Sequence, residues 1–241
     1  NRRMSLHIID AISPKRIFQL NNEKGEETFI ELKQEDVTSY NKFIVKMEGF
    51  SGKNISYMTP TEFLRLKNYL YDVPSAKEIK ELGWQRQGGF FAWGNGVMDE
   101  GSFNQVNDYG LIEYKGANYY LPAKSKIYED NVQLNVFERS FVYTELSNVS
   151  FHDYVAKVVQ VSGWKGYVGI QYVILTLFKD IIVNNTRWFP ILNLFGKTRC
   201  GKTGFANSIM AFFLADPKPT NINTGSLPSI AQVVGRVSNA L

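Results

Sequence analysis

Short stretches with alternating or β-rich character occupy the first part of the chain, at residues 16–20, 28–33 and 42–47. Such stretches predict strands, and Asn-Asn-Glu-Lys-Gly at residues 21–25 predicts a turn between the first two. A helix is expected from Thr59 or Thr61, where Thr-Pro-Thr-Glu is typical of a helix start. Its apolar face contains Phe63, Leu66, Leu70 and Tyr71.

A second β-rich region follows at residues 83–122. Its predicted strands cover residues 83–85, 89–97, 111–114 and 117–121, and Asn95-Gly96 and Lys115-Gly116 are hairpin signals. Residues 1–122 are therefore expected to form an accessory α+β region rich in antiparallel strands. Its aromatic residues favour the core of a small domain over a stacking platform for single-stranded nucleic acid. These residues are Trp84, Phe90, Phe91, Trp93, Tyr119 and Tyr120.

The pattern becomes helical after a polar, less regular stretch at residues 123–150, which is interpreted as a connector. Ser150 is the expected N-cap of a helix whose apolar stripe runs to Ser162-Gly163. A second helix is predicted over residues 167–183. An apolar run at residues 189–195 then predicts a buried parallel strand.

The residues after this strand match the phosphate-loop pattern G-x-x-x-x-G-K-[ST] at every specified position, and a helix is expected from about Lys202. Strand, glycine loop and helix predict the start of an α/β P-loop nucleotide-binding domain over residues 151–241. Glycines bring backbone N–H groups close to an anion, and the helix N-terminus adds its positive dipole end. The expected nucleotide-binding residues are Gly196, Lys197, Thr198, Arg199, Cys200, Gly201, Lys202, Thr203 and Gly204.

Within this loop Lys202 is expected to reach the β- and γ-phosphates of ATP, and the Thr203 hydroxyl to bind Mg²⁺. Both are therefore candidate catalytic residues of an ATPase. Cys200, next to a helix N-terminus and Lys202, is a candidate for redox inhibition, although a variable loop position is the favoured interpretation. The chain lacks the Asn-Lys-x-Asp sequence that reads guanine, which disfavours GTP.

Composition adds few constraints. A net charge of +4 and a pI near 9.0 permit nucleic-acid binding without requiring it. Cys200 is the single cysteine, which excludes an internal disulfide and fits a reducing cytoplasm. With two distant histidines, a histidine metal site is not expected. No secretory signal or uninterrupted apolar run of membrane-spanning length is present, so we expect a cytoplasmic protein without a membrane partner.

Several of these segments together resemble a family. Gly83-Trp84, residues 90–96 (FFAWGNG), residues 119–123 (YYLPA), residues 177–180 (LFKD) and the phosphate loop are similar to mobile-element replicative helicases of phages, plasmids and cassette chromosomes. The resemblance covers residues 58–241. It implies a β-rich N-terminal domain before an AAA+/helicase-type ATPase domain, and a motor that works as a hexameric ring on single-stranded or forked DNA.

The chain departs from a complete motor in one respect. Hydrolysis needs an acidic residue at the end of an apolar strand, and the only acidic residue after Thr203 is Asp216, in a helix-end context. We therefore expect a fragment of an ATPase whose second acidic motif and arginine finger lie beyond Leu241, and which need not be active alone. Arg236 is interpreted as a helix-surface arginine rather than a functional one. The alternative function is a nucleotide-dependent switch or signalling ATPase whose β-rich domain binds protein.

Overall fold

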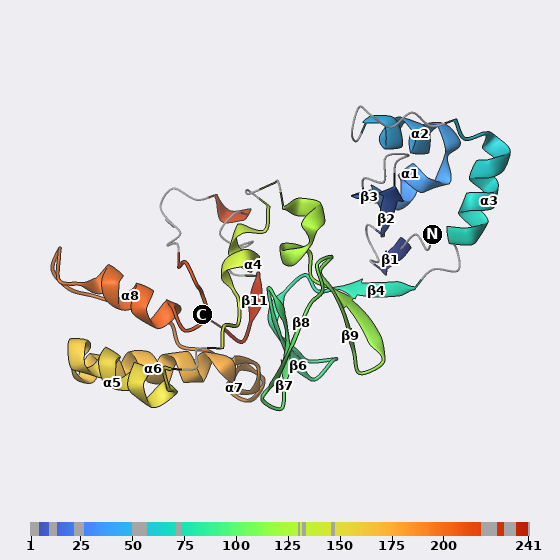
Figure 1. Cartoon of the computed structure of the whole chain (residues 1–241). Coiled ribbons are helices and arrows are strands. Elements are labelled where there is room, and N and C mark those ends of the chain that lie inside the picture. Colours follow the sequence, from blue (N-terminus) through green and yellow to red (C-terminus); the bar gives the residue numbers. More distant parts are fainter. Residues whose placement is uncertain are drawn as a thin grey trace. The chain divides into compact units, whose positions relative to one another are not determined.

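The computed structural model describes residues 5–9, 14–21, 27–49, 57–70, 74–129, 131, 134–145, 148–217, 226–228 and 235–240. The chain divides into two compact units (Figure 1). The first unit contains Asn1–Ile79 and Val106–Leu134, and the second contains Lys80–Gln105 and Asn135–Leu241. Residues 80–105, which the sequence pattern groups with the N-terminal strands, thus belong to the same unit as the phosphate loop. The expected connector, residues 123–150, is shared between the units.

The first unit is built on a six-stranded sheet with the order β3-β2-β1-β4-β10-β9. The predicted strands at residues 16–20 and 28–33 are confirmed as β2 and β3, whereas residues 22–25 of the predicted turn lie outside the described residues. The sheet is mixed, because β4 pairs in parallel with both β1 and β10. The expectation of antiparallel strands therefore holds only for part of this sheet. The strands are β1 Ser5–Ile9, β2 Lys15–Asn21, β3 Glu27–Lys33, β4 Ser75–Glu78, β9 Leu111–Tyr114 and β10 Ala117–Tyr120.

Three helices accompany this sheet: α1 Gln34–Thr38, α2 Tyr40–Gly49 and α3 Pro60–Leu70. Their apolar residues Val37, Phe43 and Phe63 pack with strand residues to form one buried cluster. The predicted helix start is confirmed, with Thr59 as the residue that exchanges hydrogen bonds with Glu62. The predicted strand at residues 42–47 is wrong, because this segment lies inside α2.

The second unit contains a five-stranded sheet with the order β11-β5-β6-β7-β8. Its strands are β5 Leu82–Gln85, β6 Phe90–Trp93, β7 Gly96–Asp99, β8 Ser102–Gln105 and β11 Val237–Ser238. Trp93 pairs with Gly96, so Gly94 and Asn95 form the hairpin loop. The Asn95 side chain holds the backbone of Tyr143 through two hydrogen bonds of 2.8 and 2.9 Å.

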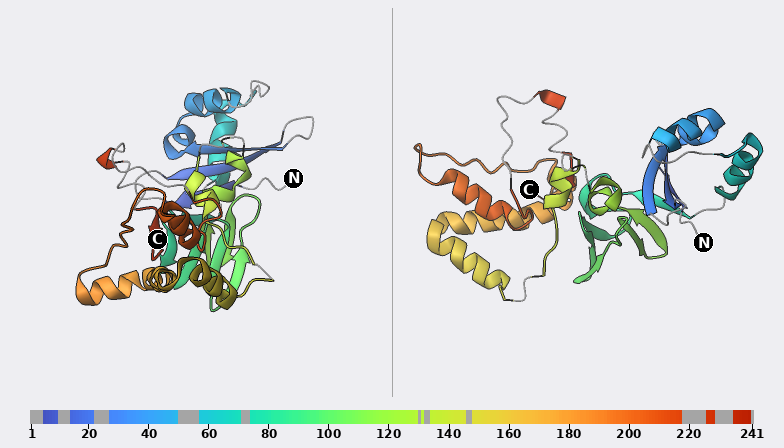
Figure 2. Two further views of the ribbon diagram at one scale, coloured as in Figure 1. Left: turned by 90° about the vertical axis from the view of Figure 1, so that its left-hand side faces the viewer. Right: turned by 45° about the horizontal axis from the view of Figure 1, so that its top comes forward.

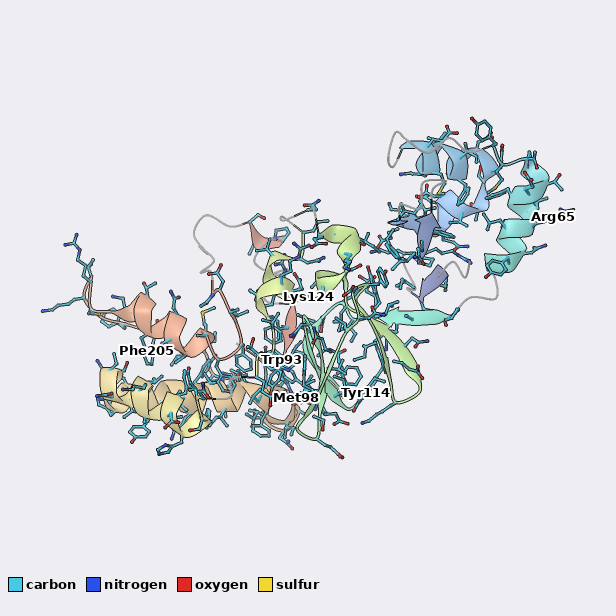
Figure 3. The ribbon with its side chains drawn as sticks, viewed as in Figure 1. Arg65, Trp93, Met98, Tyr114, Lys124 and Phe205 are labelled. Carbon is cyan, nitrogen blue, oxygen red and sulfur yellow. The ribbon has the colours of Figure 1, made fainter. Side chains whose placement is uncertain are left out.

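Of the six aromatic residues expected to form a core, three are buried and three, Trp84, Phe91 and Tyr119, are half-buried. Phe90, Trp93 and Tyr120 are buried. In the second unit, Trp93 (Figure 3) stacks on Phe141, whose ring in turn lies nearly parallel to that of Phe213. Phe141 follows α4, Val136–Ser140, and Phe213 follows α8, Lys202–Met210. The helix that leaves the phosphate loop is therefore anchored to the sheet of its own unit by a stack of aromatic rings.

Three helices lie side by side next to the phosphate loop (Figures 1 and 2). α5, Phe151–Ser162, begins with the predicted cap: Ser150 and Asp153 exchange side-chain-to-backbone hydrogen bonds. α6, Trp164–Leu177, packs on α5 at Gly166 and on α8 at Gly169. Because neither glycine has a Cβ, the helices approach closely at both crossings.

The predicted single helix over residues 167–183 is wrong. α6 ends at Leu177, and α7, Lys179–Thr186, continues at an angle of 79°. Asn239, which is buried, holds this break: its amide donates to Leu177 O and Asp180 Oδ1, and it accepts from the Asp180 backbone N–H. No single helix in the described ranges has the length and apolarity to cross a membrane. α6 and α7 together have this length and apolarity, but as a bent pair.

Candidate functional site

The phosphate-loop residues lie between an extended segment and α8. The predicted buried strand at residues 189–195 is wrong, since no described strand pairs with this segment and it has no regular secondary structure. Its side chains Ile191 and Phe195 are 89% and 98% exposed. At the start of the segment the Tyr172 hydroxyl donates to Pro190 O and the ring of Phe189 approaches that of Tyr172, and Leu192 and Leu194 farther along are half-buried.

The loop itself turns through two left-handed residues, Arg199 with φ 63° and Gly201 with φ 86°. Gly201 is the N-cap of α8, and this conformation suits glycine because it has no Cβ to clash with the backbone. At Gly196 a Cβ would lie 3.0 Å from Cys200 Sγ. The two glycines of the motif thus satisfy different needs, a left-handed turn at Gly201 and close approach at Gly196.

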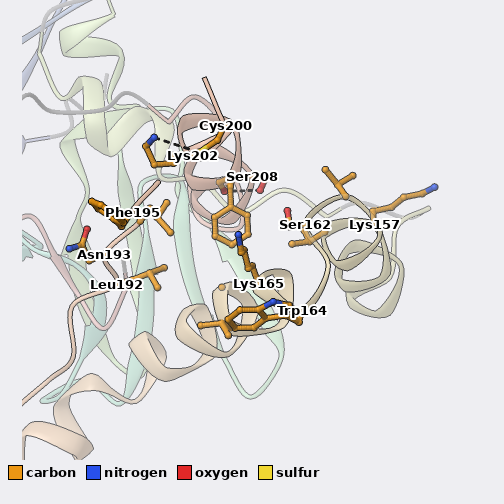
Figure 4. Close-up of a pocket in the computed structure, with 18 of the residues that line it drawn as sticks. Lys157, Ser162, Trp164, Lys165, Leu192, Asn193, Phe195, Cys200, Lys202 and Ser208 are labelled. Atoms are coloured by element: carbon orange, nitrogen blue, oxygen red, sulfur yellow. Dashed lines mark hydrogen bonds between the residues drawn. The ribbon is translucent and has the colours of Figure 1, made fainter. Parts of the chain in front are cut away.

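Lys202 is the residue that ties the loop together. Its Nζ donates to Gly196 O at 2.9 Å and to Lys197 O at 2.7 Å, and it lies 3.6 Å from Cys200 Sγ (Figure 4). The amino group therefore sits against the concave side of its own loop. Because two loop carbonyls hold the Lys202 side chain, its amino group is already positioned to contact a ligand bound by the loop.

The loop and the first turn of α8 also carry backbone N–H donors. The first helical hydrogen bond of α8 runs from Phe205 N to Gly201 O at 2.9 Å. Before it, the N–H groups of residues 197–204 have no acceptor among the described residues, and no side chain caps the helix. Several unpaired donors, a helix N-terminus and an ammonium group together form a favourable setting for an anion.

The structure brings four of the expected residues into direct contact: Gly196, Lys197, Cys200 and Lys202. The other predicted residues of the loop, Thr198, Arg199, Gly201, Thr203 and Gly204, are exposed. Thr203 opens the first turn of α8 with its hydroxyl available to a ligand. Cys200 is a free, exposed thiol.

A groove of about 990 Å³ begins at the loop and runs between α5, α6, α8 and the extended segment. Its lining includes Cys200, Gly201 and Lys202 from the loop together with Trp164 and Lys165 from the first turn of α6. Tyr154, also in the lining, donates to Ser208 O at 2.7 Å, and burial raises the pKa of this tyrosine. The sequence pattern does not identify Trp164 and Lys165 as part of the site. The only local signal is the helix end at Ser162-Gly163, which places these two residues at the start of the next helix.

Positive charge predominates around the site. Residues 151–210 contain seven basic and two acidic side chains. One acid, Asp153, caps α5, and the other, Asp180, lies 3.5 Å from Arg86 Nη2 and accepts from Asn239. The basic residues are Lys157, Lys165, Lys179, Arg187, Lys197, Arg199 and Lys202.

Arg236 is not part of a helix. It occupies a turn before β11, with its Nε 3.9 Å from Glu138 Oε1 and its guanidinium over the ring of Phe137. Its backbone carbonyl accepts from Leu82 N. The interpretation as a helix-surface arginine is therefore wrong, and the contacts of Arg236 support the packing of β11 and α4.

The residues present fit a magnesium nucleotide. Mg²⁺ bound with phosphates takes most of its ligands from phosphate and water, and the Thr203 hydroxyl would supply one of the protein ligands, the other being an acidic residue. Within the described part of the chain, no group of three or more His, Cys, Asp or Glu side chains forms a separate metal site.

Comparison with known proteins leaves the site to be judged on its own geometry. The chain matches no protein family, and no curated protein or solved structure is detectably similar to it.

Proposed function

We propose that the chain binds ATP with Mg²⁺ at residues 196–204 and acts as the ATPase of a DNA replication motor. One observation carries the nucleotide assignment: the Lys202 ammonium lies inside a loop whose N–H groups, from residue 197 to residue 204, have no acceptor among the described residues. A triphosphate supplies the acceptors that these donors lack, and charge-assisted hydrogen bonds of this kind are the strong ones.

In this proposal each residue has a distinct role. Lys202 exchanges the carbonyls of Gly196 and Lys197 for the β- and γ-phosphate oxygens, and the backbone of residues 197–201 cradles the phosphates. The hydroxyl of Thr203 would hold Mg²⁺, which supplies charge neutralisation on the phosphates. Gly204 leaves the first turn of α8 open to the ligand.

The motor on DNA rests on weaker support. The excess of basic residues between positions 151 and 210 favours a polyanionic partner. The resemblance of several segments to mobile-element helicases favours single-stranded or forked DNA as that partner, and a hexameric ring as the working assembly.

A switch or signalling ATPase remains the second candidate, and one observation favours it. Phe90, Trp93 and Tyr120 are buried, so the described β-rich parts do not present these rings for base stacking. Under this alternative the β-rich parts bind protein.

ATP turnover by the full-length protein, measured with and without single-stranded DNA, separates the two candidates. A DNA motor is stimulated by DNA, and the stimulation disappears in Lys202→Ala but persists in Lys46→Ala, a control at an exposed lysine of α2. Turnover that depends on Lys202 but is indifferent to DNA would favour the switch. Turnover unchanged in Lys202→Ala would remove the phosphate-loop assignment.

A further inference from the structure

The groove beside the phosphate loop is continuous with the loop itself. Cys200, Gly201, Lys202 and Gly204 form part of its wall, and the first turn of α6 forms another part. In Figure 4, Trp164 and Lys165 lie on the opposite side of the opening from Cys200 and Lys202. A ligand whose phosphates are bound by the loop therefore has open space beside it that is lined in part by an aromatic side chain.

The aromatic side chain of this lining is mostly exposed. Trp164 is 71% exposed, although it is large, apolar and at the start of a 14-residue helix. Val161 and Phe195, which also line the groove, are 85% and 98% exposed. An exposed indole next to an open apolar groove is available for stacking by a flat ring.

The polar lining complements an anionic, hydroxyl-bearing ligand. The groove contains Lys157, Lys165 and Lys202 and no acidic side chain. It also contains Ser162 and Asn193, whose side chains have no hydrogen-bond partner among the described residues. A volume of about 990 Å³ lies at the upper end of the range of small-molecule sites.

We propose that this groove is the nucleoside subsite of the nucleotide site, in which the base of ATP stacks on Trp164. The inference rests on the proposed binding of triphosphate by the loop and adds the part of the ligand that the loop does not hold. Lys165, Ser162 and Asn193 supply donors and acceptors to the base edge and ribose hydroxyls. The enclosing walls are α5, α6 and the extended segment.

Continuity with the loop favours a nucleoside over a peptide or a nucleic-acid strand. An apolar peptide that filled the groove would leave three lysines without counter-charge. A single strand continues beyond one nucleotide, whereas a groove of about 990 Å³ has the size of a small-molecule site. One small ligand that carries phosphates and a flat ring matches both the loop and Trp164.

Calorimetric titration with two ligands, Mg²⁺–ATP and Mg²⁺–tripolyphosphate, tests the subsite. Trp164→Ala is expected to weaken ATP binding by about tenfold or more, because base–aromatic stacking contributes on this scale. Tripolyphosphate affinity is expected to stay unchanged, since this ligand has no base. Trp164→Phe, which keeps an aromatic ring, restores most of the ATP affinity. The matched control is Trp188→Ala, at a tryptophan that is 66% exposed and does not line the groove.

The outcomes separate this inference from the proposed function. ATP affinity that survives Trp164→Ala but is lost in Lys202→Ala overturns the subsite and leaves the phosphate loop intact. Equal losses for ATP and tripolyphosphate in Trp164→Ala also overturn it, because the indole would then act through the loop or the fold. Failure of the unaltered protein to bind either ligand overturns the proposed function, and the subsite with it.

Discussion

At the scale of single residues, two glycines near the start of α8 have open space around them but different backbone conformations. Gly201 has φ 86°, whereas Gly204 lies in the helix, and an added Cβ would meet no atom within 4 Å at either position. Steric contacts therefore do not distinguish the two positions. The conformation of the backbone does.

This difference predicts substitutions of opposite sign. Gly201→Ala is expected to destabilise the protein by about 1 kcal/mol, because a left-handed alanine is strained. Gly204→Ala is expected to be neutral or to stabilise by up to about 1 kcal/mol, because alanine favours the helix. Urea unfolding of the two variants measures the contrast, and indistinguishable midpoints would contradict the left-handed cap at Gly201.

A second residue, His7, is expected to make the stability of the first unit depend on pH. The pKa of His7 is lowered from its ordinary value of 6.5, first by burial and then by the charge of Arg16. Its Nδ1 is buried without a hydrogen-bond partner among the described residues. The unfolded chain therefore takes up a proton near pH 6.5 that the folded chain resists, so stability is present above this pH and is lost as pH falls.

We expect His7→Gln to reduce the loss of stability between pH 7.5 and pH 5.0, measured by urea unfolding at both values. His152→Gln serves as the control, since the side chain of His152 is exposed on α5. The assignment would be refuted by a pH dependence that is identical in the unaltered protein and in His7→Gln.

At the scale of elements, α5 and α6 are held close by a glycine whose neighbour is backbone. A Cβ at Gly166 would lie 2.9 Å from both Val158 O and Val159 Cα of α5. A backbone cannot rotate away as a side chain does, so the helices must separate to admit a methyl group. The crossing of α6 and α8 at Gly169 differs, because there the nearest atom is the end of the Phe205 ring.

Gly166→Ala is therefore expected to lower the free energy of unfolding by about 1–3 kcal/mol, as overpacking does elsewhere. The helix preference of alanine opposes this loss and does not cancel it. The measurement is again urea unfolding, with Gly204→Ala as a helical control in open space. A Gly166→Ala protein as stable as this control would show that the helices separate at little cost.

Elements were predictable where their signal is local. The caps of α3 and α5 and the start of α8 follow from neighbouring residues, and all three are confirmed. The segment at residues 42–47 is β-rich in composition, yet Tyr40, Phe43, Ile44 and Met47 recur at helical spacing and face the first-unit core. Weighting this periodicity above composition predicts α2 correctly.

At the scale of the whole molecule, the remaining errors involve partners distant in the chain. The break between α6 and α7 depends on Asn239, about 60 positions later in the chain. The sequence around residue 178 alone therefore does not predict the break. The apolar segment at residues 189–195 reads as a strand, but a strand requires a pairing partner and none is described. For the same reason the loop residues were found from the motif, while Trp164 and Lys165 emerged only from the packing of three helices.

The binding of nucleotide by the loop is the claim on which the other functional inferences depend, and titration calorimetry with Mg²⁺–ATP tests it directly. The unaltered protein and Lys46→Ala should bind equally, whereas Lys202→Ala should bind about 10- to 100-fold more weakly because it loses charge-assisted hydrogen bonds to phosphate. Circular dichroism should show the same fold in all three, since the hydrogen bonds of Lys202 within the described part of the chain stay in its own loop. Equal affinity of Lys202→Ala and the unaltered protein would contradict a nucleotide site at this loop.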